Sequence, residues 1–564
     1  MQTEVLIVGA GPTGMVLALW LARLGVRVRI IDRAAGPGTA ARAFALQART
    51  LEIYDRLGLA RDALARGRPV ARMTVHFGSG RAQPIPFGAF GQGLSPFPFV
   101  LMLLQDDHEK LLIDHLAAVG VQVERNTELV DLEDVGGLVR ARLRGQSGAD
   151  RICEAAFVCG CDGAGSIVRQ LLKIEFPGHA SEEIFYVADV EASGALADGE
   201  LHYVMSGDDV CSIFPRRGRG RLRLIGLVPA AVRQRLSQFS FEDVGPQIRQ
   251  DTGLEISVVE SFATYPVHQR IADTWRKGRV FLLGDAAHMH SPAGGQGLNA
   301  GVGDAVNLAW KLGTVLRDGA DASLLDTYQS ERRSAAQQIA ATTDRGFALQ
   351  AQGGRGMSLA RSALILWGPD LLQVGPVGRW AFRMVSQIGV HYRNAVAGYG
   401  RAGRVAAGHR LPWVKPTDGI DNFAALQPPF PIEPAAPAAD EPSDGFAAPM
   451  PAEHLGAYRF TERALGFGWQ AQVYGQAGDA LREACADWGL ALKEFPWAPE
   501  ASRAGLARNA VYLIRPDGYV AYASRSQAVL KLADYLERFE IRFRSAPGAG
   551  GTLHAGLGAP HTPM

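Results

Sequence analysis

The first part of the chain alternates apolar runs with glycines in the order typical of a βαβ unit. Val5–Val8 is a short apolar run that predicts a buried strand, and residues 15–24 form an apolar segment of helical length. Residues 26–30 alternate apolar side chains with arginines, which predicts a second strand ending at Asp32. Because crossovers of this kind are right-handed, we expect the two strands to be parallel neighbours.

The pattern changes twice further along the chain. Between about residues 183 and 260, short β-rich pieces separated by Gly and Arg predict an antiparallel sheet. A buried strand follows at 280–283, and two long helices are expected, over about 299–316 and 324–341. The α/β pattern therefore encloses a β-rich insertion.

A Pro/Ala-rich segment, residues 415–452, has little periodicity and is expected to be a loop or a linker. A further α/β unit follows it. Its strands are expected on either side of the hairpin turn Arg515–Gly518, with helices over 478–488 and 527–539. The Gly/Pro-rich end of the chain is expected to be disordered.

Composition narrows the possible partners. The 564 residues include 58 basic and 57 acidic side chains, so the net charge of +1 gives no reason to expect nucleic acid or an anionic membrane. No apolar run reaches about 18 residues, so no membrane span is expected. The five cysteines are an odd number in a long chain, which predicts reduced thiols, and without a signal-peptide pattern at the start we expect a cytoplasmic protein.

A glycine-rich turn, Gly-Ala-Gly-Pro-Thr-Gly, follows the first strand. Gly9 would permit the tight turn, Gly11 would let a pyrophosphate approach the backbone, and Gly14 would let the helix pack against the strand. Asp32 ends the second strand, where its carboxylate could accept hydrogen bonds from a ribose. The alternative is a tight turn in an ordinary α/β domain.

Three later motifs carry possible chemistry. Gly284-Asp285 ends a buried strand, where Asp285 could hold a polyol such as ribitol or merely cap a helix. Residues 291–299 place a glycine-rich backbone ahead of a helix, which suits the negative charge of a reduced flavin. Asp162-Gly163 follows another strand, and Arg169 comes soon after; the alternative is a tight turn with a surface charge.

Taken together, these motifs resemble those of the group A flavoprotein monooxygenases, the aromatic hydroxylase family of p-hydroxybenzoate hydroxylase. That family has a GxGxxG, a DG and a GD motif in this order, and residues 284–312 match its pattern nearly throughout. Where the family has Pro-Pro, this chain has Ser291-Pro292, which keeps the proline that faces the flavin ring in the family. The resemblance covers about residues 3–345.

The resemblance implies FAD as the cofactor and adds three contact positions. Arg42 matches an arginine that contacts the cofactor, Gln105 a glutamine before a helix, and Leu129 a position whose backbone meets adenine. The alternatives are a surface charge, a helix cap and a core side chain. The complete set of expected cofactor-binding residues is Gly9, Gly11, Pro12, Thr13, Gly14, Asp32, Arg33, Arg42, Gln105, Leu129, Asp162, Gly163, Gly284, Asp285, Pro292, Gly295, Gly297, Leu298 and Asn299.

The resemblance also implies the reaction. NAD(P)H, with NADPH as the expected donor, would reduce FAD, and O₂ would form a C4a-hydroperoxide that hydroxylates a small phenolic or polyketide-type aromatic substrate. No catalytic side chain is assigned, because the flavin carries the chemistry, and no metal is expected at His288 and His290. Candidates for the substrate side are Tyr203, Phe214, Arg223, Tyr265 and Pro292.

The C-terminal unit resembles the thioredoxin-like domain of phenol, hydroxyphenylpropionate and polyketide hydroxylases, through Val511–Ala521. It has no Cys-x-x-Cys, and Cys485 is alone there, so no redox role is expected. Packing or oligomerisation is the expected role, in a monomer or a homodimer.

The expected fold class is α/β, a Rossmann-like FAD-binding domain interleaved with an antiparallel substrate sheet and followed by the thioredoxin-like domain. Two alternatives stay open for function: Baeyer–Villiger oxygenation of a ketone, and FAD-dependent ligand binding without turnover. A halogenase is disfavoured, since its Trp-x-Trp motif is missing. The expected division is 1–178 and 278–395 for the FAD-binding domain with its helical extension, 179–277 for the substrate sheet, 396–545 for the C-terminal domain and 546–564 for the tail.

Overall fold

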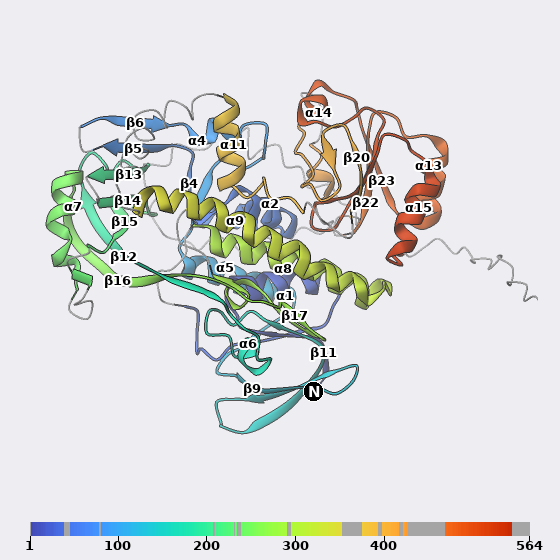
Figure 1. Ribbon diagram of the computed structural model, residues 1–564, viewed down its shortest axis with the longest axis horizontal. Coiled ribbons are helices and arrows are strands. Elements are labelled where there is room, and N and C mark those ends of the chain that lie inside the picture. The colour runs from blue at the N-terminus through green and yellow to red at the C-terminus, as the bar shows by residue number, and fades with distance from the viewer. Residues whose placement is uncertain are drawn as a thin grey trace, which may run out of the picture.

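Two long helices cross the middle of the molecule, with a β-sheet on one side and the C-terminal unit on the other (Figure 1). These helices are α8 (Gln296–Asp318) and α9 (Thr327–Ala351). The computed structural model describes residues 2–38, 45–77, 80–206, 209–229, 232–233, 239–289, 295–351, 375–392, 398–416, 421–426 and 468–543.

The first sheet is built on the predicted βαβ unit. Strand β1 pairs in parallel with β2 and β11, and β11 pairs in parallel with β18, in the order β17-β18-β11-β1-β2-β8. A hairpin of β9 and β10 extends β11. The strands are β1 (Gln2–Val8), β2 (Val28–Ile31), β8 (Val123–Glu124), β9 (Glu128–Asp134), β10 (Val139–Arg144), β11 (Asp150–Gly160), β17 (Arg276–Lys277) and β18 (Val280–Leu282).

Helices cover this sheet because its strands are apolar on both faces. Val5, Leu6 and Ile7 of β1 are fully buried. Three of the helices that pack here are α1 (Pro12–Arg23), α5 (Gln105–Ala118) and α8, and the short helix α6 (Ile167–Leu171) follows β11. The parallel strands therefore end at one edge, where the turns after β1, β11 and β18 lie together.

The second sheet is mostly antiparallel, in the order β19-β16-β12-β15-β14-β13-β5-β6. Its last two strands come from residues 73–85, within the segment that the sequence assigns to the FAD-binding domain, so this segment joins both sheets. The strands are β5 (Met73–Phe77), β6 (Ala82–Ile85), β12 (Gly178–Ser193), β13 (Leu201–Ser206), β14 (Asp209–Pro215), β15 (Arg221–Leu227), β16 (Glu255–Ile271) and β19 (His288–Met289).

The two faces of the second sheet differ in what covers them. Its outer face, with Ile213, Leu222 and Leu224, packs in one cluster with residues of α7 (Gly245–Thr252). Its inner face packs against a three-stranded sheet of β3 (Ala45–Leu46), β7 (Val100–Met102) and β4 (Arg68–Val70). Around this small sheet lie α2 (Ala48–Leu57), α3 (Ala60–Arg66), α4 (Phe87–Gly91) and α11 (Gly375–Val385).

The C-terminal unit has its own sheet, in the order β21-β20-β25-β24-β22-β23. Strand β22 is parallel to β23 and antiparallel to β24, which forms the predicted hairpin with β25. The elements are β20 (Tyr399–Ala402), β21 (Val405–Ala406), β22 (Gln470–Tyr474), α13 (Asp479–Trp488), β23 (Ala491–Phe495), α14 (Pro499–Ala504), β24 (Val511–Ile514), β25 (Val520–Ser524) and α15 (Val529–Arg538).

Helix boundaries depart from the prediction in places where local chemistry explains them. Helix α1 begins at Pro12, three residues earlier than the apolar run, because a proline is well accommodated at a first helical position. Residues 322–326 form a separate 3₁₀ turn whose cap is Asp321, so α9 begins at Thr327. Most of the Pro/Ala-rich segment and the C-terminal tail lie outside the described residues. None of the described helices has the length and apolarity that a membrane crossing requires.

Candidate active site

The turn after β1 has the shape of a phosphate cradle. Gly9 has a φ of 103°, and a Cβ there would lie 2.4 Å from the carbonyl oxygen of Cys161. A Cβ on Gly14 would lie 2.1 Å from the carbonyl oxygen of Gly9, so the helix packs directly on the turn. At Gly11, by contrast, no described atom lies within 4 Å of an added Cβ. The turn is therefore closed on the protein side and open above Gly11, where the N-terminus of α1 presents free N–H groups.

Asp32 is fixed at the end of β2. Its Oδ2 accepts a hydrogen bond of 2.7 Å from the N–H of Ala10, and its Oδ1 accepts one of 2.8 Å from Ala34. Arg125 lies beside it, with Nη1 3.8 Å from Oδ2, whereas Arg33 is exposed. The carboxylate retains further acceptor capacity for ribose hydroxyls.

Sequence reasoning missed Arg125. Its Nη1 donates to the carbonyl of Gly36 at 3.2 Å, while its Nη2 is buried without a partner among the described residues. Arg125 comes directly after β8, and the pairing of β8 with β2 brings it to Asp32. Only that pairing, between residues 93 positions apart in the sequence, could have identified it.

Asp162 offers a second unfilled polar atom. It follows β11, and Gly163 adopts a φ of 76° beside it. Its Oδ2 accepts a hydrogen bond of 3.1 Å from the N–H of Val168, but its Oδ1 is buried without a partner in the described chain. Burial raises the pKa of this carboxyl. A buried acceptor with no partner is costly, so a ligand that donates a hydrogen bond fits this position.

Arg169 is buried, which rules out the alternative of a surface charge. Its Nη1 donates to the carbonyl of Ala286 at 2.9 Å and its Nη2 to the carbonyl of Ala164 at 2.7 Å. Its guanidinium lies 3.9 Å from the ring centroid of Phe176. This side chain joins the turn after β11 to the turn after β18.

The turn after β18 presents Asp285 to solvent. Gly284 adopts a φ of 57°, and Asp285 lies inside the following 3₁₀ turn rather than at its cap, so the helix-cap alternative does not apply. Behind the turn, His288 is buried, its Nε2 lies 2.7 Å from Oδ2 of Asp304, and its ring stacks on Trp275. The exposed carboxylate lies where it can face a polyol chain.

Helix α8 begins at Gln296, and its N-cap residue Gly295 adopts a φ of 62° with no side-chain cap among the described residues. The side chain of Asn299 is fully engaged: its Oδ1 accepts from the N–H of Gln47 (2.9 Å) and the hydroxyl of Thr50 (2.6 Å), and its Nδ2 donates to Gly295 and Ala45. Any cofactor contact at Asn299 is therefore through its backbone, as is expected of Gly297 and Leu298.

The remaining predicted cofactor positions lie on α1, α5 and β9 or beyond the described residues. Gln105 is the first residue of α5, and its Nε2 donates to Glu109 at 2.8 Å. Leu129 is buried on β9. Pro12 and Thr13 belong to the first turn of α1. Arg42, His290 and Pro292 lie outside the described residues.

The four described substrate-side candidates lie on one face of the second sheet. Strand register places Arg223 beside both Phe214 and Asp189, and Tyr265 beside Phe185, whose ring stacks on it at 5.8 Å. Tyr203 shares this face through the pairing of β13 with β14. The face is the inner one, which packs against β3, β4 and β7.

Phe214 and Arg223 differ in what they can offer a substrate. Phe214 packs on the same apolar cluster as Ala45. The carbonyl of Ala45 accepts a hydrogen bond from the side chain of Asn299, in the first turn of α8. Arg223 is buried and forms a bidentate ion pair with Asp189, at 2.7 and 2.8 Å. The pair is electrically neutral, so Arg223 does not present a free positive charge to this face.

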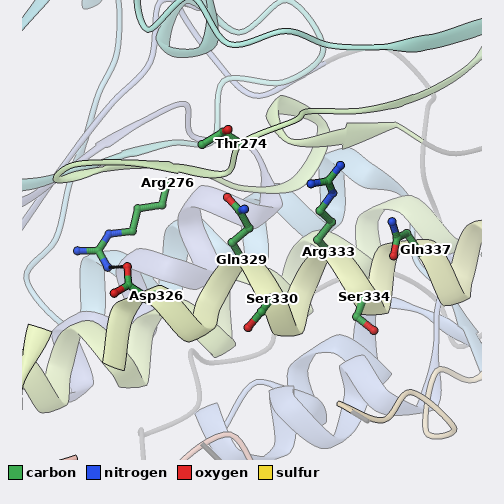
Figure 2. A pocket seen from close by; sticks show the side chains of 8 residues that line it. All are labelled: Thr274, Arg276, Asp326, Gln329, Ser330, Arg333, Ser334 and Gln337. Atoms are coloured by element: carbon green, nitrogen blue, oxygen red, sulfur yellow. Dashed lines mark hydrogen bonds and ion pairs between the residues drawn. The ribbon is translucent and has the colours of Figure 1, made fainter. Parts of the chain in front are cut away.

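A polar hollow of about 450 Å³ opens elsewhere, along α9 (Figure 2). Arg276 there pairs with Asp326 at 2.5 Å, and Arg333 donates to the carbonyl of Asp273. Thr274, Gln329, Ser330, Ser334 and Gln337 complete its lining, and no predicted site residue contributes. We therefore distinguish this hollow from the cofactor site. No group of three or more potential metal ligands occurs among the described residues.

Comparison with known proteins identifies the family of this chain. A family model described as "FAD binding domain" matches residues 2–343. The 6-methylpretetramide 4-monooxygenase of Streptomyces rimosus is 34% identical, over 99% of this chain and 97% of its own length. The pentachlorophenol 4-monooxygenase of Sphingobium chlorophenolicum is 30% identical over 78% of this chain and 81% of its own. The structure of an anhydrotetracycline hydroxylase from Streptomyces rimosus superposes with a TM-score of 0.71 at 27% identity, over 96% of this chain and 99% of that one.

Proposed function

This chain belongs to the FAD-binding domain family and is an FAD-dependent monooxygenase, and we propose that it hydroxylates a phenolic or polyketide-type aromatic ring at the expense of NAD(P)H and O₂. Bound FAD supplies the electron transfer and oxygen activation. The protein has to hold the cofactor, present the ring and exclude water.

The observation that carries the proposal is the inner face of the second sheet. Aromatic side chains from separate strands, Tyr203, Phe214 and Tyr265, lie on one face that also packs against Ala45, next to the start of α8. Its buried charge is neutralised by the Arg223–Asp189 pair. An aromatic, uncharged surface suits a planar ring, and relatives of this chain are named for aromatic and polyketide substrates.

Tyr265 adds a hydrogen-bond donor to that surface. Burial raises the pKa of its phenol, so the hydroxyl stays protonated at neutral pH. It could donate to a substrate oxygen and so orient the ring.

We assign the cofactor contacts by the chemistry of each turn. The pyrophosphate lies over Gly11, the ribose at Asp32, the ribitol chain at Asp285, and the flavin ring at the start of α8. Arg42 and Pro292 are included from the family pattern. The unpartnered Oδ1 of Asp162 and Nη2 of Arg125 support a ligand on this edge of the sheet.

The C-terminal unit is proposed to be a thioredoxin-like domain without redox activity. The order β23-β22-β24-β25, with one parallel and two antiparallel pairings, supports this assignment. Cys485 is a buried free thiol, and burial raises its pKa to about 11. With all five cysteines free and buried, we propose a cytoplasmic location.

The test uses the purified yellow holoenzyme. NADPH and NADH oxidation is followed with a panel of phenols and polycyclic polyketide aromatics, and products are analysed by mass and NMR. We expect at least one aromatic compound to accelerate NAD(P)H oxidation and to gain one oxygen atom on its ring. Oxidation that never exceeds the substrate-free rate contradicts the proposal, and an oxygen inserted beside a ketone would replace hydroxylation with Baeyer–Villiger chemistry.

A further inference from the structure

The turn after β18 is held from behind by a buried carboxylate. Oδ2 of Asp304, on α8, accepts a hydrogen bond of 2.9 Å from the N–H of Gly284, the residue before Asp285. Its Oδ1 accepts one of 2.7 Å from Nε of Arg332, on α9. Asp304 is fully buried. The position of this cofactor turn is therefore coupled to Arg332.

Arg332 connects in turn to the C-terminal domain. Its Nη1 donates to the hydroxyl of Tyr392 at 3.1 Å. The ring of Tyr392 stacks on Tyr519, with centroids 4.3 Å apart. Tyr519 directly follows the hairpin turn Arg515–Gly518. A continuous path of contacts thus joins Gly284 to the C-terminal hairpin.

The hairpin turn Arg515–Gly518 also forms direct hydrogen bonds with α9 and α8. Arg515 donates to both carboxylate oxygens of Glu331, at 2.7 and 3.0 Å, and pairs with Asp517. Asp517 accepts a hydrogen bond of 3.1 Å from the indole of Trp310 on α8. Its backbone carbonyl accepts one of 2.6 Å from Arg49 on α2.

These groups are almost completely inaccessible to solvent, so none can exchange its partner for water. Burial would raise the pKa of Glu331, but the charges of Arg515 and Lys311 lower it to about 2. Removing the hairpin would take the bidentate partner Arg515 from Glu331, whose carboxylate is buried inside the FAD-binding domain and would keep only Lys311 and Asn307. The arrangement of α8 and α9 therefore depends on the C-terminal hairpin.

We propose that the C-terminal domain is a positioning element for FAD. Its hairpin holds α8, whose first residues border the flavin site, and through Tyr519, Tyr392 and Arg332 it fixes the Gly284–Ala286 turn. The inference rests on FAD binding and is independent of the substrate. Arg515, Tyr519 and Tyr392 are positioning residues, because each acts on the cofactor through other side chains.

The test compares two buried tyrosine hydroxyls in full-length holoenzyme. Tyr392→Phe removes the hydroxyl that accepts from Nη1 of Arg332 and keeps the ring stack. The matched control, Tyr512→Phe, removes a buried hydroxyl that accepts from Ala507 and donates to Ala402, away from the path. FAD dissociation constants are measured by flavin fluorescence, with the visible spectrum and melting temperature of each variant.

We expect Tyr392→Phe to weaken FAD binding about three- to tenfold, the effect of one lost hydrogen bond, and to alter the bound-flavin spectrum. Tyr512→Phe should leave the affinity within about twofold while lowering the melting temperature comparably. Tyr519→Leu, which removes the ring stack, should weaken FAD more than Tyr392→Phe.

Two results would overturn the proposal: unchanged FAD affinity in both Tyr392→Phe and Tyr519→Leu, or equal loss in the Tyr512→Phe control. If Tyr519→Leu does not fold, Tyr392→Phe decides alone. Since FAD affinity is measured without substrate, a failure here is distinct from a failure of the hydroxylase proposal.

Discussion

The Nη1 atom of Arg169 lies 2.9 Å from the carbonyl oxygen of Ala286, a residue 117 positions away in the sequence. This hydrogen bond joins the turn after β11 to the turn after β18, both of which lie at the proposed cofactor site.

We expect Arg169→Met to weaken FAD binding about tenfold, because the two turns would lose their common tie. Arg169→Lys can reach only one of the two carbonyls, so its FAD affinity should lie between those of the parent and of Arg169→Met. The control is Arg144→Met, since Arg144 is exposed and pairs with Asp150 far from the site. FAD titration by fluorescence checks the order; equal affinities for Arg169→Met and the control would contradict it.

The two glycines at the start of α1 should separate folding from cofactor binding. Gly14→Ala places a methyl group 2.1 Å from the carbonyl oxygen of Gly9, so the helix must shift, and we expect lower stability as well as loss of FAD. Gly11→Ala meets no described atom within 4 Å, so the apoprotein should melt normally yet fail to bind FAD, because the methyl group occupies the pyrophosphate space.

Melting curves of both apoproteins, followed by FAD titration, distinguish these outcomes. Normal FAD affinity in Gly11→Ala would show that the pyrophosphate lies elsewhere.

Arg223→Met should destabilise the protein by about 3–5 kcal/mol, because it leaves the buried Asp189 without its bidentate partner. The double variant Arg223→Met, Asp189→Leu should recover most of this loss, since no charge is then stranded. Urea denaturation measures both. If Arg223→Met were as stable as the parent, the prediction would be wrong, because Arg223 would then not be needed to compensate the buried charge of Asp189.

Acid stability should depend on His108. Its Nε2 forms a hydrogen bond of 2.5 Å with the hydroxyl of Tyr54, and burial lowers its pKa from 6.5 to about 3. Because the unfolded chain takes up the proton first, this contribution to stability is complete above pH 6.5 and is lost as the pH falls toward 3.

The loss attributable to His108 is about 2 kcal/mol at pH 5. His108→Gln should therefore show a flatter fall of unfolding free energy between pH 6.5 and 5 than the parent or the exposed control His179→Gln. Identical slopes in chemical denaturation would refute the assignment.

The secondary structure and turns that depend on neighbouring residues could be predicted from the sequence. The βαβ unit, the antiparallel insertion and the hairpin around Arg515–Gly518 follow from apolar periodicity and turn residues, and the structure has all three. The glycine turn could be predicted because each glycine answers a local steric demand, as the contacts of Gly9 and Gly14 show.

Long-range pairings could not be predicted in this way. Strands β5 and β6 join the second sheet through a parallel pairing with β13 that no local pattern encodes. The sequence left Arg169 open between a motif residue and a surface charge and did not single out Arg125, since the roles of both depend on partners brought close by the sheet order. The ion pair between Arg223 and Asp189 also depends on strand pairing, so the sequence did not show that the charge of Arg223 is neutralised.

The buried ion network around Arg515 also bears on cooperativity. A domain can unfold separately only if the surface it exposes tolerates water, and here separation would take the partner Arg515 from Glu331, which is buried in the remaining fold. The two units should consequently share one calorimetric transition despite having separate sheets, since two apolar clusters contain side chains from both. A protease cut between them would then fail to release a stable N-terminal fragment, and the chain would behave in the cell as one inseparable folding unit.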